Sequence, residues 1–530
     1  MKKVKSFLEE QNNSIKSLMK KAYFAYYNAI TTGKEEFYKE YEKYALEMED
    51  FFHNKENFEK IKDFLKKSNE DPIIKRQLEV LHDSYLGSQG EMDLLKKILE
   101  KSTQIEKRFN MFRAKVGEKE LTDNEIKDIL RKETDSEKLK AAWEGSKKQG
   151  EIVEKEILEL IKLRNELAKN LGYENYYKMH LELGEQKEEE IEETFEELNN
   201  LTKDSFKKIK EEMDRILTDK YKISKEDLKP WHYQDLFFQE GPDIFDLKLE
   251  EIENSDVIKI SEKFFEEAGL NVKDILEKSD LYEKPGKYQH ACCIDLDREG
   301  DVRIVQSTKN DAYWAETTLH ELGHAVYDKG YVYTDLPFLL KSSAHTFVTE
   351  AIALLFERNI FNRTFLEKFY GFNKEKLEKI NEDLYKKMKL KQLVFSRWSQ
   401  VMFNFERELY KNPDQDLNKL WWDLVKKYQM IEFYRDKPDW ASKIHIVGAP
   451  VYYHNYLLGN VLASQINNYI KEKILEDSSN NSLDYSNKKV GEYLNKEIFE
   501  HGQKYKWDKL IEKATGEKLN PKYYSKDFCD

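Results

Sequence analysis

Three residues near the middle of the chain, His320, Glu321 and His324, form the pattern H-E-x-x-H. On a helix, residues four positions apart lie one above the other, so both imidazoles can bind one metal ion. Glu321 would then lie beside the ion, where it can take a proton from water. The pattern predicts a zinc hydrolase. The alternative is a helix whose two histidines are ordinary core groups.

The residues around this pattern favour a helix. Asp311 is a suitable N-cap, and Gly330 stands where a helix would end. Small or apolar side chains recur between them at helical spacing, at Ala315, Leu319, Leu322, Ala325 and Val326. We therefore predict one helix between Asp311 and Gly330 that presents both histidines on the same face.

A second helix is predicted to begin near Ser342 or Ser343 and to run to Glu357. A carboxylate in its apolar run FVTEAIALLF is costly to bury unless a cation compensates it, and a metal ion would do so. Glu350 is therefore the expected third ligand. Glu357, two turns later on the same face, remains the alternative, because spacing alone does not decide between them.

A β hairpin is predicted directly before the metal helix, over residues 285–307. Two extended runs flank the turn-like residues 297–300, and Val302 and Ile304 alternate with polar neighbours. A strand at this place would lie beside the metal, where it can pair with an extended peptide through backbone hydrogen bonds.

Composition favours a helical protein in a reducing compartment. The chain has only 20 glycines and 9 prolines in 530 residues, as expected where helices are many and turns are few. The net charge of 89 − 102 = −13, with no basic stripe, argues against nucleic-acid and anionic-membrane partners. The sequence has no signal-peptide core and no membrane span. The three cysteines (Cys292, Cys293 and Cys529) cannot form a disulfide framework, so we expect reduced thiols and a cytoplasmic location.

The chain up to about residue 220 is typical of successive amphipathic helices, most clearly over 191–216. No Pro- or Ser-rich linker divides it, so we expect residues 1–530 to form a single domain. The segment 221–242 is too aromatic for a linker, and its His232 is expected to be structural rather than a metal ligand. A histidine with two tyrosines can stabilise an oxyanion and hold a substrate. A later loop, residues 436–460, concentrates such groups: Lys443, His445, Tyr453, His454 and Tyr456.

Three separate motifs resemble one peptidase family. They are QHACCIDLDREGDVRIVQST, HELGH with a glutamate 26 residues after its second histidine, and KIHIVGAPVYYHNYLLG. Their order and spacing resemble the angiotensin-converting-enzyme family of gluzincin peptidyl-dipeptidases, and FVTEAIALLFE is also similar to the thimet and oligopeptidase F family. The resemblance implies a mostly α fold. It has two lobes of helices around a deep cleft and a small antiparallel β hairpin beside the zinc helix.

The resemblance also implies roles for individual residues. His320, His324 and Glu350 match the zinc ligands, and Glu321 matches the general base. His290, on the hairpin, matches a histidine that contacts substrate next to the scissile bond.

The loop residues match the groups that bind the rest of the substrate. His445 and Tyr456 match the pair that contacts the substrate carbonyl, with the tyrosine stabilising the oxyanion. Lys443 and Tyr453 match groups that hold the C-terminal carboxylate in dipeptide-releasing members.

Three positions depart from the family pattern. Leu354 replaces the aspartate that orients a ligand histidine, and Glu316 is a candidate for that role. The glutamine that completes the carboxylate pocket has no clear counterpart near residues 249–250. Asn455 replaces an arginine that would bind an activating chloride, which argues against chloride activation.

The sequence therefore predicts a zinc metallopeptidase that acts on short peptides and releases C-terminal dipeptides, a carboxypeptidase-like activity. The alternatives are an oligoendopeptidase of the oligopeptidase F type and a non-catalytic helical protein that binds peptides. The expected cofactor is Zn²⁺, the expected partners are short peptides, and the working expectation for assembly is a monomer.

Overall fold

The computed structural model describes residues 2–67, 71–245, 247, 249–477 and 482–529. The chain forms two compact units: unit 1 is Met1–Gln89, Lys248–Tyr385 and Leu458–Tyr523, and unit 2 is Gly90–Leu247, Lys386–Leu457 and Tyr524–Asp530. Three of the five boundaries along the chain fall inside helices, namely α16 (Lys374–Lys411), α19 (His454–Tyr469) and α22 (Lys522–Phe528). That the two units act as one catalytic domain stays a prediction.

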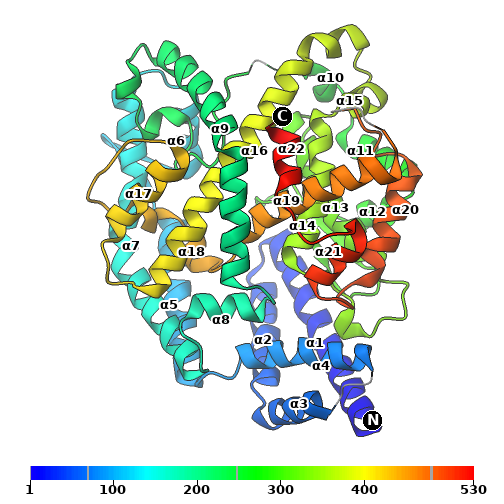
Figure 1. Cartoon of the computed structure of the whole chain (residues 1–530). Helices are drawn as coiled ribbons and strands as arrows, with labels where there is room; N and C mark the ends of the chain where they lie inside the picture. Colours follow the sequence, from blue (N-terminus) through cyan, green and yellow to red (C-terminus); the bar gives the residue numbers. More distant parts are fainter. Residues whose placement is uncertain (1, 68–70, 246, 248, 478–481, 530) are drawn as a thin grey trace. The chain divides into compact units, whose positions relative to one another are not determined.

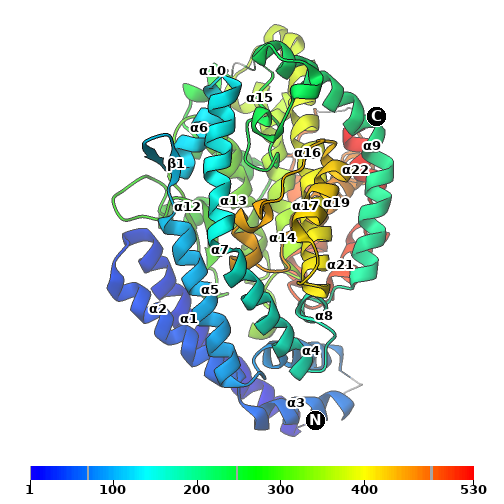
Figure 2. The same ribbon diagram turned by 90° about the vertical axis from the view of Figure 1, so that its left-hand side faces the viewer.

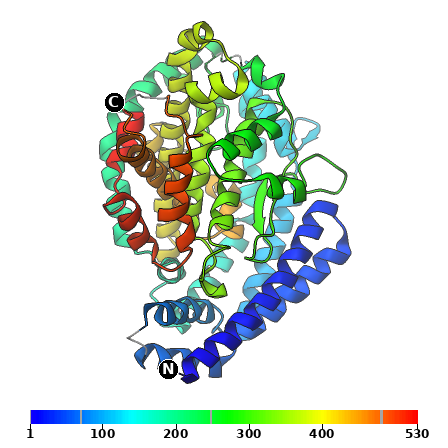
Figure 3. The ribbon, with the colours of Figure 1, turned by 90° about the vertical axis from the view of Figure 1, so that its right-hand side faces the viewer.

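The described residues of unit 1 are mainly helical (Figure 1), and their two named strands form a β hairpin. Its longest helices are α1 (Lys2–Thr32) and α2 (Glu35–Phe52), which pack side by side (Figure 3), and α13 (Ala312–Gly330). Its other helices and strands are α3 (Lys55–Lys67), α4 (Pro72–Gly87), α10 (Glu250–Glu253), α11 (Val257–Glu267), α12 (Lys273–Lys278), β3 (Cys292–Asp295), β4 (Val302–Val305), α14 (Thr346–Glu357), α15 (Arg363–Tyr370), α20 (Lys488–Glu497) and α21 (Trp507–Thr515). Short helical turns are η3 (Phe338–Leu340), η4 (Arg358–Phe361), η6 (Ile470–Ile474) and η7 (Phe499–His501).

Unit 2 is built on long helices, with α5 (Met92–Met111) lying along α7 (Ser136–Asn170) (Figure 2). Its other elements are β1 (Ala114–Val116), β2 (Lys119–Leu121), α6 (Asp123–Lys132), α8 (Tyr176–Leu183), α9 (Glu188–Tyr221), η1 (Lys225–Asp227), η2 (Pro230–Tyr233), α17 (Leu417–Gln429), η5 (Asp439–Ser442) and α18 (His445–Gly448). The mostly α prediction is confirmed. The β1–β2 hairpin was not predicted, because three-residue strands are too short to show a clear alternation.

Helix α9 shows why the amphipathic pattern predicted these elements well. The apolar side chains at three- and four-residue spacing are buried: Ile191, Phe195, Leu198, Phe206, Ile209 and Met213. Charged residues occupy the other faces, so the helix gains stability from one apolar stripe packed against unit 2. Among the described helices, none combines the length and the apolar character that a membrane span requires.

The predicted hairpin is the antiparallel pair β3–β4, in which Cys292 pairs with Val305 and Asp295 with Val302. Asp295 Oδ1 accepts a hydrogen bond from the Arg298 amide at 2.8 Å, and this closes the turn. The strands are shorter than predicted, because the residues before Cys292 follow an irregular path that includes the turn at Gly286, whose φ is +82°.

Candidate functional site

Helix α13 begins and ends where the sequence predicts. The Asp311 carboxylate accepts a hydrogen bond from the Trp314 amide at 2.8 Å, and the last helical residue is Gly330. Helix α14 begins later than predicted, at Thr346, because the His345 side chain caps the Phe347 amide and residues 342–345 are not helical. Both glutamates under discussion, Glu350 and Glu357, lie on α14 and are buried.

The structure brings three of the predicted metal ligands together. One nitrogen from His320, one from His324 and one oxygen from Glu350 all lie within 4.8 Å of one another. The two Nε2 atoms are 3.3 Å apart. Glu350 places Oε1 3.8 Å from His320 Nε2 and Oε2 3.6 Å from His324 Nε2.

This donor set fits zinc. Bonds of about 2.1 Å in a tetrahedron separate two ligand atoms by about 3.4 Å, close to the separations between these three side chains. Two imidazoles and one carboxylate are also the donors of catalytic zinc sites, which keep a fourth position open.

The other ring nitrogens already have partners. His320 Nδ1 lies 2.7 Å from Glu357 Oε2, and His324 Nδ1 lies 2.8 Å from Thr349 Oγ1. These contacts direct both Nε2 atoms toward Glu350, because a ring nitrogen that bonds a neighbour fixes the orientation of the imidazole. Glu357 therefore supports His320, the role for which the sequence suggested Glu316, and Leu354 contributes only apolar surface to the buried helix.

Charges in the cluster shift its pKa values strongly. Burial lowers the pKa of His320, but Glu357 and Glu350 outweigh it and raise the value to about 10. Burial and the neighbouring His320 hold the pKa of His324 well below its usual range. Burial raises the pKa of Glu321 to about 7, although His320 opposes the shift. The pKa of Glu321 therefore suits a group that accepts and donates a proton near neutral pH.

Strand β3 contacts the predicted base directly. The backbone amide of Cys293 donates a hydrogen bond to the Glu321 carboxylate, so the hairpin helps to aim that side chain. His290 lies two residues before β3 and is exposed, with its ring centroid 5.2 Å from that of Tyr288.

Helices α13 and α14 can carry one site because they pack very closely at Gly323. A Cβ atom at this position would lie 2.7 Å from the Ala353 Cα atom, a distance that would force the helices apart. Gly323 lies between the two histidines, and Ala353 is one turn after Glu350. The absence of a side chain at Gly323 therefore sets the distance between the histidines and the third donor.

Gly323→Ala is expected to weaken zinc binding and to destabilise the protein by about 1–3 kcal/mol, because overpacking shifts the backbone. Alanine in an open helix position would instead stabilise by up to about 1 kcal/mol. Zinc titration and thermal unfolding of the variant measure both effects. An increase in stability with unchanged zinc affinity would contradict the close packing.

The predicted substrate residues of unit 2 also lie together. The Tyr453 ring is 5.1 Å from that of His445 and 5.4 Å from that of Tyr456, between ring centroids. The Tyr453 hydroxyl accepts a hydrogen bond from Trp398 Nε1 at 2.6 Å. Burial and the Lys443 charge lower the pKa of His445 to about 3, so the imidazole is neutral at pH 7. Its buried Nδ1 makes no hydrogen bond within the described part of the chain.

Lys443 is buried among aromatic rings and one amide. Its Nζ donates to Gln239 Oε1 at 2.6 Å and lies 5.3 Å from the Tyr453 ring centroid. Burial lowers the pKa of Lys443 to about 8, and Asp235 opposes the shift. Nothing in the sequence indicated that Gln239 lies beside Lys443, because 204 residues separate the two and no local pattern connects them.

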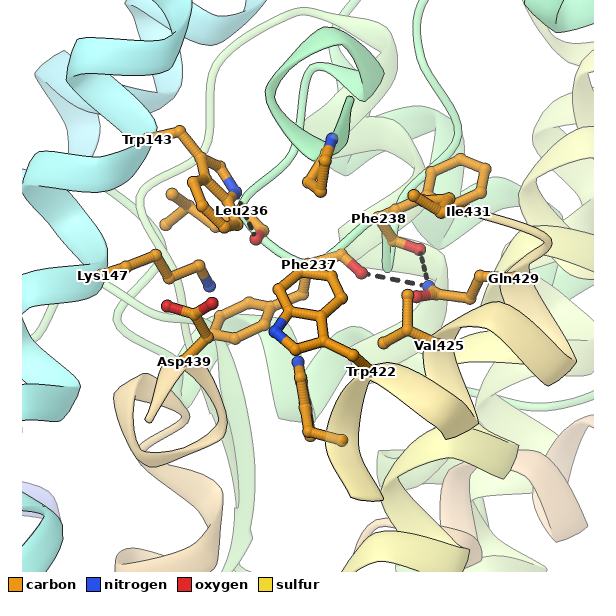
Figure 4. Close-up of a pocket in the computed structure, with 12 residues that line it drawn as sticks. Trp143, Lys147, Leu236, Phe237, Phe238, Trp422, Val425, Gln429, Ile431 and Asp439 are labelled. Atoms are coloured by element: carbon orange, nitrogen blue, oxygen red, sulfur yellow. Dashed lines mark hydrogen bonds between the residues drawn. The ribbon is translucent and has the colours of Figure 1, made fainter. Parts of the chain in front are cut away.

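A pocket of unit 2 lies next to this loop and contains none of the predicted site residues. Figure 4 shows Lys147 and Asp439 pointing toward one another at its edge, with Phe237 and Trp422 beside them. Lys147 Nζ lies 3.1 Å from the Phe237 ring centroid, and Lys443 Nζ lies 5.2 Å from the same centroid. Burial lowers the pKa of Lys147 to about 7, although the negative charge of Asp439 opposes this shift. The pair supports η5, the segment that leads into Lys443.

Two further residues have structural partners. His232 Nε2 lies 2.8 Å from Ser136 Oγ, and its Nδ1 accepts a hydrogen bond from the Lys229 amide. Asn455 is buried, and its Oδ1 accepts a hydrogen bond from Gln186 Nε2 at 2.8 Å. A neutral, satisfied amide thus occupies the position where the family resemblance places an arginine.

Comparison with known proteins agrees with this geometry. The profile of peptidase family M2, angiotensin-converting enzyme, matches residues 1–233 and 242–522. Carboxypeptidase 1 of Bacillus subtilis (strain 168) is 25% identical over 260 residues, which are 44% of this chain and 50% of that protein. The angiotensin-converting enzyme-related protein of Drosophila melanogaster is 24% identical over 243 residues, 43% of this chain and 38% of that protein. The matched region thus spans half or less of each relative. The family profile covers nearly the whole chain, which therefore belongs to the angiotensin-converting-enzyme family of peptidases.

Proposed function

We propose that this protein is a zinc-dependent peptidase that acts on short peptides and releases dipeptides from their C-termini. The preassembled donor set of His320, His324 and Glu350 supports the proposal most directly, because the Nδ1 atoms of both histidines already have partners and their Nε2 atoms converge on Glu350. Zinc bound there would supply Lewis-acid activation of water and of the scissile carbonyl.

The chain's own residues would carry the proton and the charge. Glu321 takes the proton of the attacking water and later gives it to the leaving amine. Its orientation comes from the Cys293 amide, and its raised pKa suits both transfers. As the family resemblance implies, Tyr456 donates a hydrogen bond to the carbonyl oxygen as negative charge develops, and neutral His445 can donate a second one.

Lys443, Gln239 and Tyr453 are proposed to bind the substrate's C-terminal carboxylate. A buried ammonium beside an amide and a phenol provides charge-assisted hydrogen bonds in a site of low dielectric constant. Such an anchor would set the position of the cut relative to the C-terminus. Because one relative carries the name carboxypeptidase, the masses of the products decide between release of one residue and release of two.

Cleavage is expected to depend on a free C-terminus and on the Lys443 proton. A peptide amide should have a KM about 10- to 100-fold higher than the matching acid, since a hydrogen bond to a charged group contributes about 1.5–3 kcal/mol. For the acid, KM should rise above pH 8, where Lys443 with its pKa of about 8 loses its charge. Lys443→Met should raise KM similarly and remove this pH dependence.

Steady-state kinetics of paired acid and amide peptides, with mass spectrometry of the products, measures these effects. Lys426→Met, at an exposed lysine of the same unit, is the matched control and should behave as the wild type. Equal cleavage of acid and amide would support an oligoendopeptidase instead. A protein that binds no stoichiometric zinc and cleaves neither peptide would support a peptide-binding role.

A further inference from the structure

Three oxygen-bearing side chains join the hairpin to the C-terminal half of α13 within unit 1. The Tyr331 hydroxyl lies 2.9 Å from Asp295 Oδ2 and 2.9 Å from Asp328 Oδ1. Tyr331 is only 2% exposed, and both carboxyl groups are partly buried. Asp295 uses its other oxygen to accept hydrogen bonds from the hairpin turn, including the Arg298 amide. The cluster therefore connects the turn of the hairpin to the metal helix.

The Tyr331 hydroxyl can form full hydrogen bonds with both carboxyl groups only when one of these groups carries a proton. Two hydrogen bonds among three oxygens need two protons, and the tyrosine hydroxyl supplies one of them. With both carboxyl groups ionised, the hydroxyl could donate to only one, and its oxygen would face the negative charge of the other. Both contacts are satisfied as hydrogen bonds when a carboxyl group of Asp295 or Asp328 carries the second proton.

The electrostatic surroundings agree with a shared proton. Burial and the neighbouring Asp295 raise the pKa of Asp328 to about 8, and burial also raises that of Asp295. The positive charge of Arg298, in the turn, opposes both shifts. Among the described residues, Cys293 on β3 and Tyr327 on α13 also interact electrostatically with Asp328.

The cluster lies on the same strand and the same helix as the contact that orients Glu321. Cys293, whose amide donates to Glu321, is two residues before Asp295 on β3. Glu321 is seven residues before Asp328 on α13, so both project from the same side of the helix. Two contacts thus hold strand β3 against α13. The first is the hydrogen bond from the Cys293 amide to Glu321, and the second joins Asp295 to Asp328 through the Tyr331 hydroxyl.

We propose that Asp295, Asp328 and Tyr331 are positioning residues that share one proton and so keep β3, with the Cys293 amide, against Glu321. The expected effect on catalysis rests on the proposed role of Glu321 as the base. The contact between the hairpin and α13 is independent of that role. Loss of the shared proton should loosen the hairpin at alkaline pH.

Hydrogen exchange of the full chain, followed by mass spectrometry at pH 7 and pH 9, tests the fastening. Asp328→Asn replaces the titrating proton with an amide that always donates to Tyr331. At pH 9, one unit above the pKa of Asp328, only about a tenth of wild-type molecules keep the proton. The β3 and β4 amides of the wild type should therefore exchange up to about tenfold faster than those of Asp328→Asn, with no such difference at pH 7.

Two more variants complete the design. Tyr331→Phe removes the bridging hydroxyl and should weaken protection of the hairpin at both pH values. Glu299→Gln removes one negative charge from the exposed tip of the same hairpin and should behave as the wild type. If Asp328→Asn does not fold, Asp295→Asn makes the same test, since its oxygen can accept from Arg298 while its amide donates to Tyr331.

Thermal unfolding gives an independent measurement with a defined sign. A carboxyl whose pKa rises from about 4 in the unfolded chain to about 8 in the folded one stabilises the protein fully below pH 4. That contribution is lost progressively between pH 4 and pH 8, and no further loss occurs above pH 8. The wild-type midpoint should therefore fall relative to that of Asp328→Asn across this window and then stay parallel. Identical pH dependence of the two proteins in both exchange and unfolding would overturn the proposal.

Catalysis provides the last comparison. Above pH 8 the kcat of the wild type should fall relative to that of Asp328→Asn by up to about tenfold per pH unit. Loss of activity at alkaline pH through deprotonation of Lys443 would instead appear as a higher KM, because Lys443 is proposed to bind the substrate. Hairpin protection that follows the expected pattern in a protein without hydrolytic activity would support the shared proton and contradict the proposed function. Equal kcat profiles in two active proteins would contradict the positioning role.

Discussion

Glu321→Gln is expected to bind zinc as the wild type does and to lose kcat by about 100- to 10,000-fold, the range for removal of a general base. Glutamine has almost the same shape as glutamate and can still accept the hydrogen bond from the Cys293 amide. It cannot take a proton from water. The variant should therefore separate metal binding from proton transfer at one position.

Zinc content after dialysis and steady-state kinetics on an unblocked peptide measure the two properties. The matched control is Glu277→Gln, which makes the same charge change at an exposed position of α12 in the same unit. The control should keep both zinc and activity. Hydrolysis by Glu321→Gln at the wild-type rate would refute the assignment of Glu321 as the base.

The second large effect is expected at the two glutamates of α14, which differ in their roles. Glu350→Ala should abolish stoichiometric zinc binding, because it removes one of three donor atoms. Glu357→Gln should weaken zinc binding by only about 10- to 100-fold, since Glu357 orients His320 through Nδ1 and does not reach the donor set. Thr349→Val should have a similar effect through His324.

Competition with a chelator of known affinity measures this order directly. Thermal unfolding of the metal-free proteins is the control, because a variant that lost zinc only through misfolding would also unfold at a lower temperature without metal. Stronger zinc loss in Glu357→Gln than in Glu350→Ala would exchange the two roles and make Glu357 the ligand.

Features that depend on neighbouring residues were predicted well from the sequence. The amphipathic period predicted successive helices up to about residue 220 and most clearly the helix over 191–216, which is α9. Asp311 and Gly330 marked the ends of α13, and the turn before Val302 marked the hairpin. These features are set by contacts within a few residues, which local pattern expresses directly. The start of α14 was wrong by three or four residues, because a histidine rather than a serine caps it.

Features that depend on distant residues needed the tertiary structure. Glu350 was the expected ligand and Glu357 the alternative, but their spacing alone did not decide between them. In the structure, Glu350 lies beside both Nε2 atoms, whereas Glu357 contacts Nδ1 of His320. Gln239 beside Lys443 likewise had no local signal.

The sequence by itself predicted the type of chemistry, because two histidines four residues apart on a helix lie on one face, with Glu321 beside them. Only the tertiary structure decided which carboxylate joins them, which amide orients Glu321, and that Asp295 and Asp328 meet across Tyr331. The physical reason is that these contacts join residues far apart in the chain, and their distances follow from how closely helices and strands pack rather than from any local pattern.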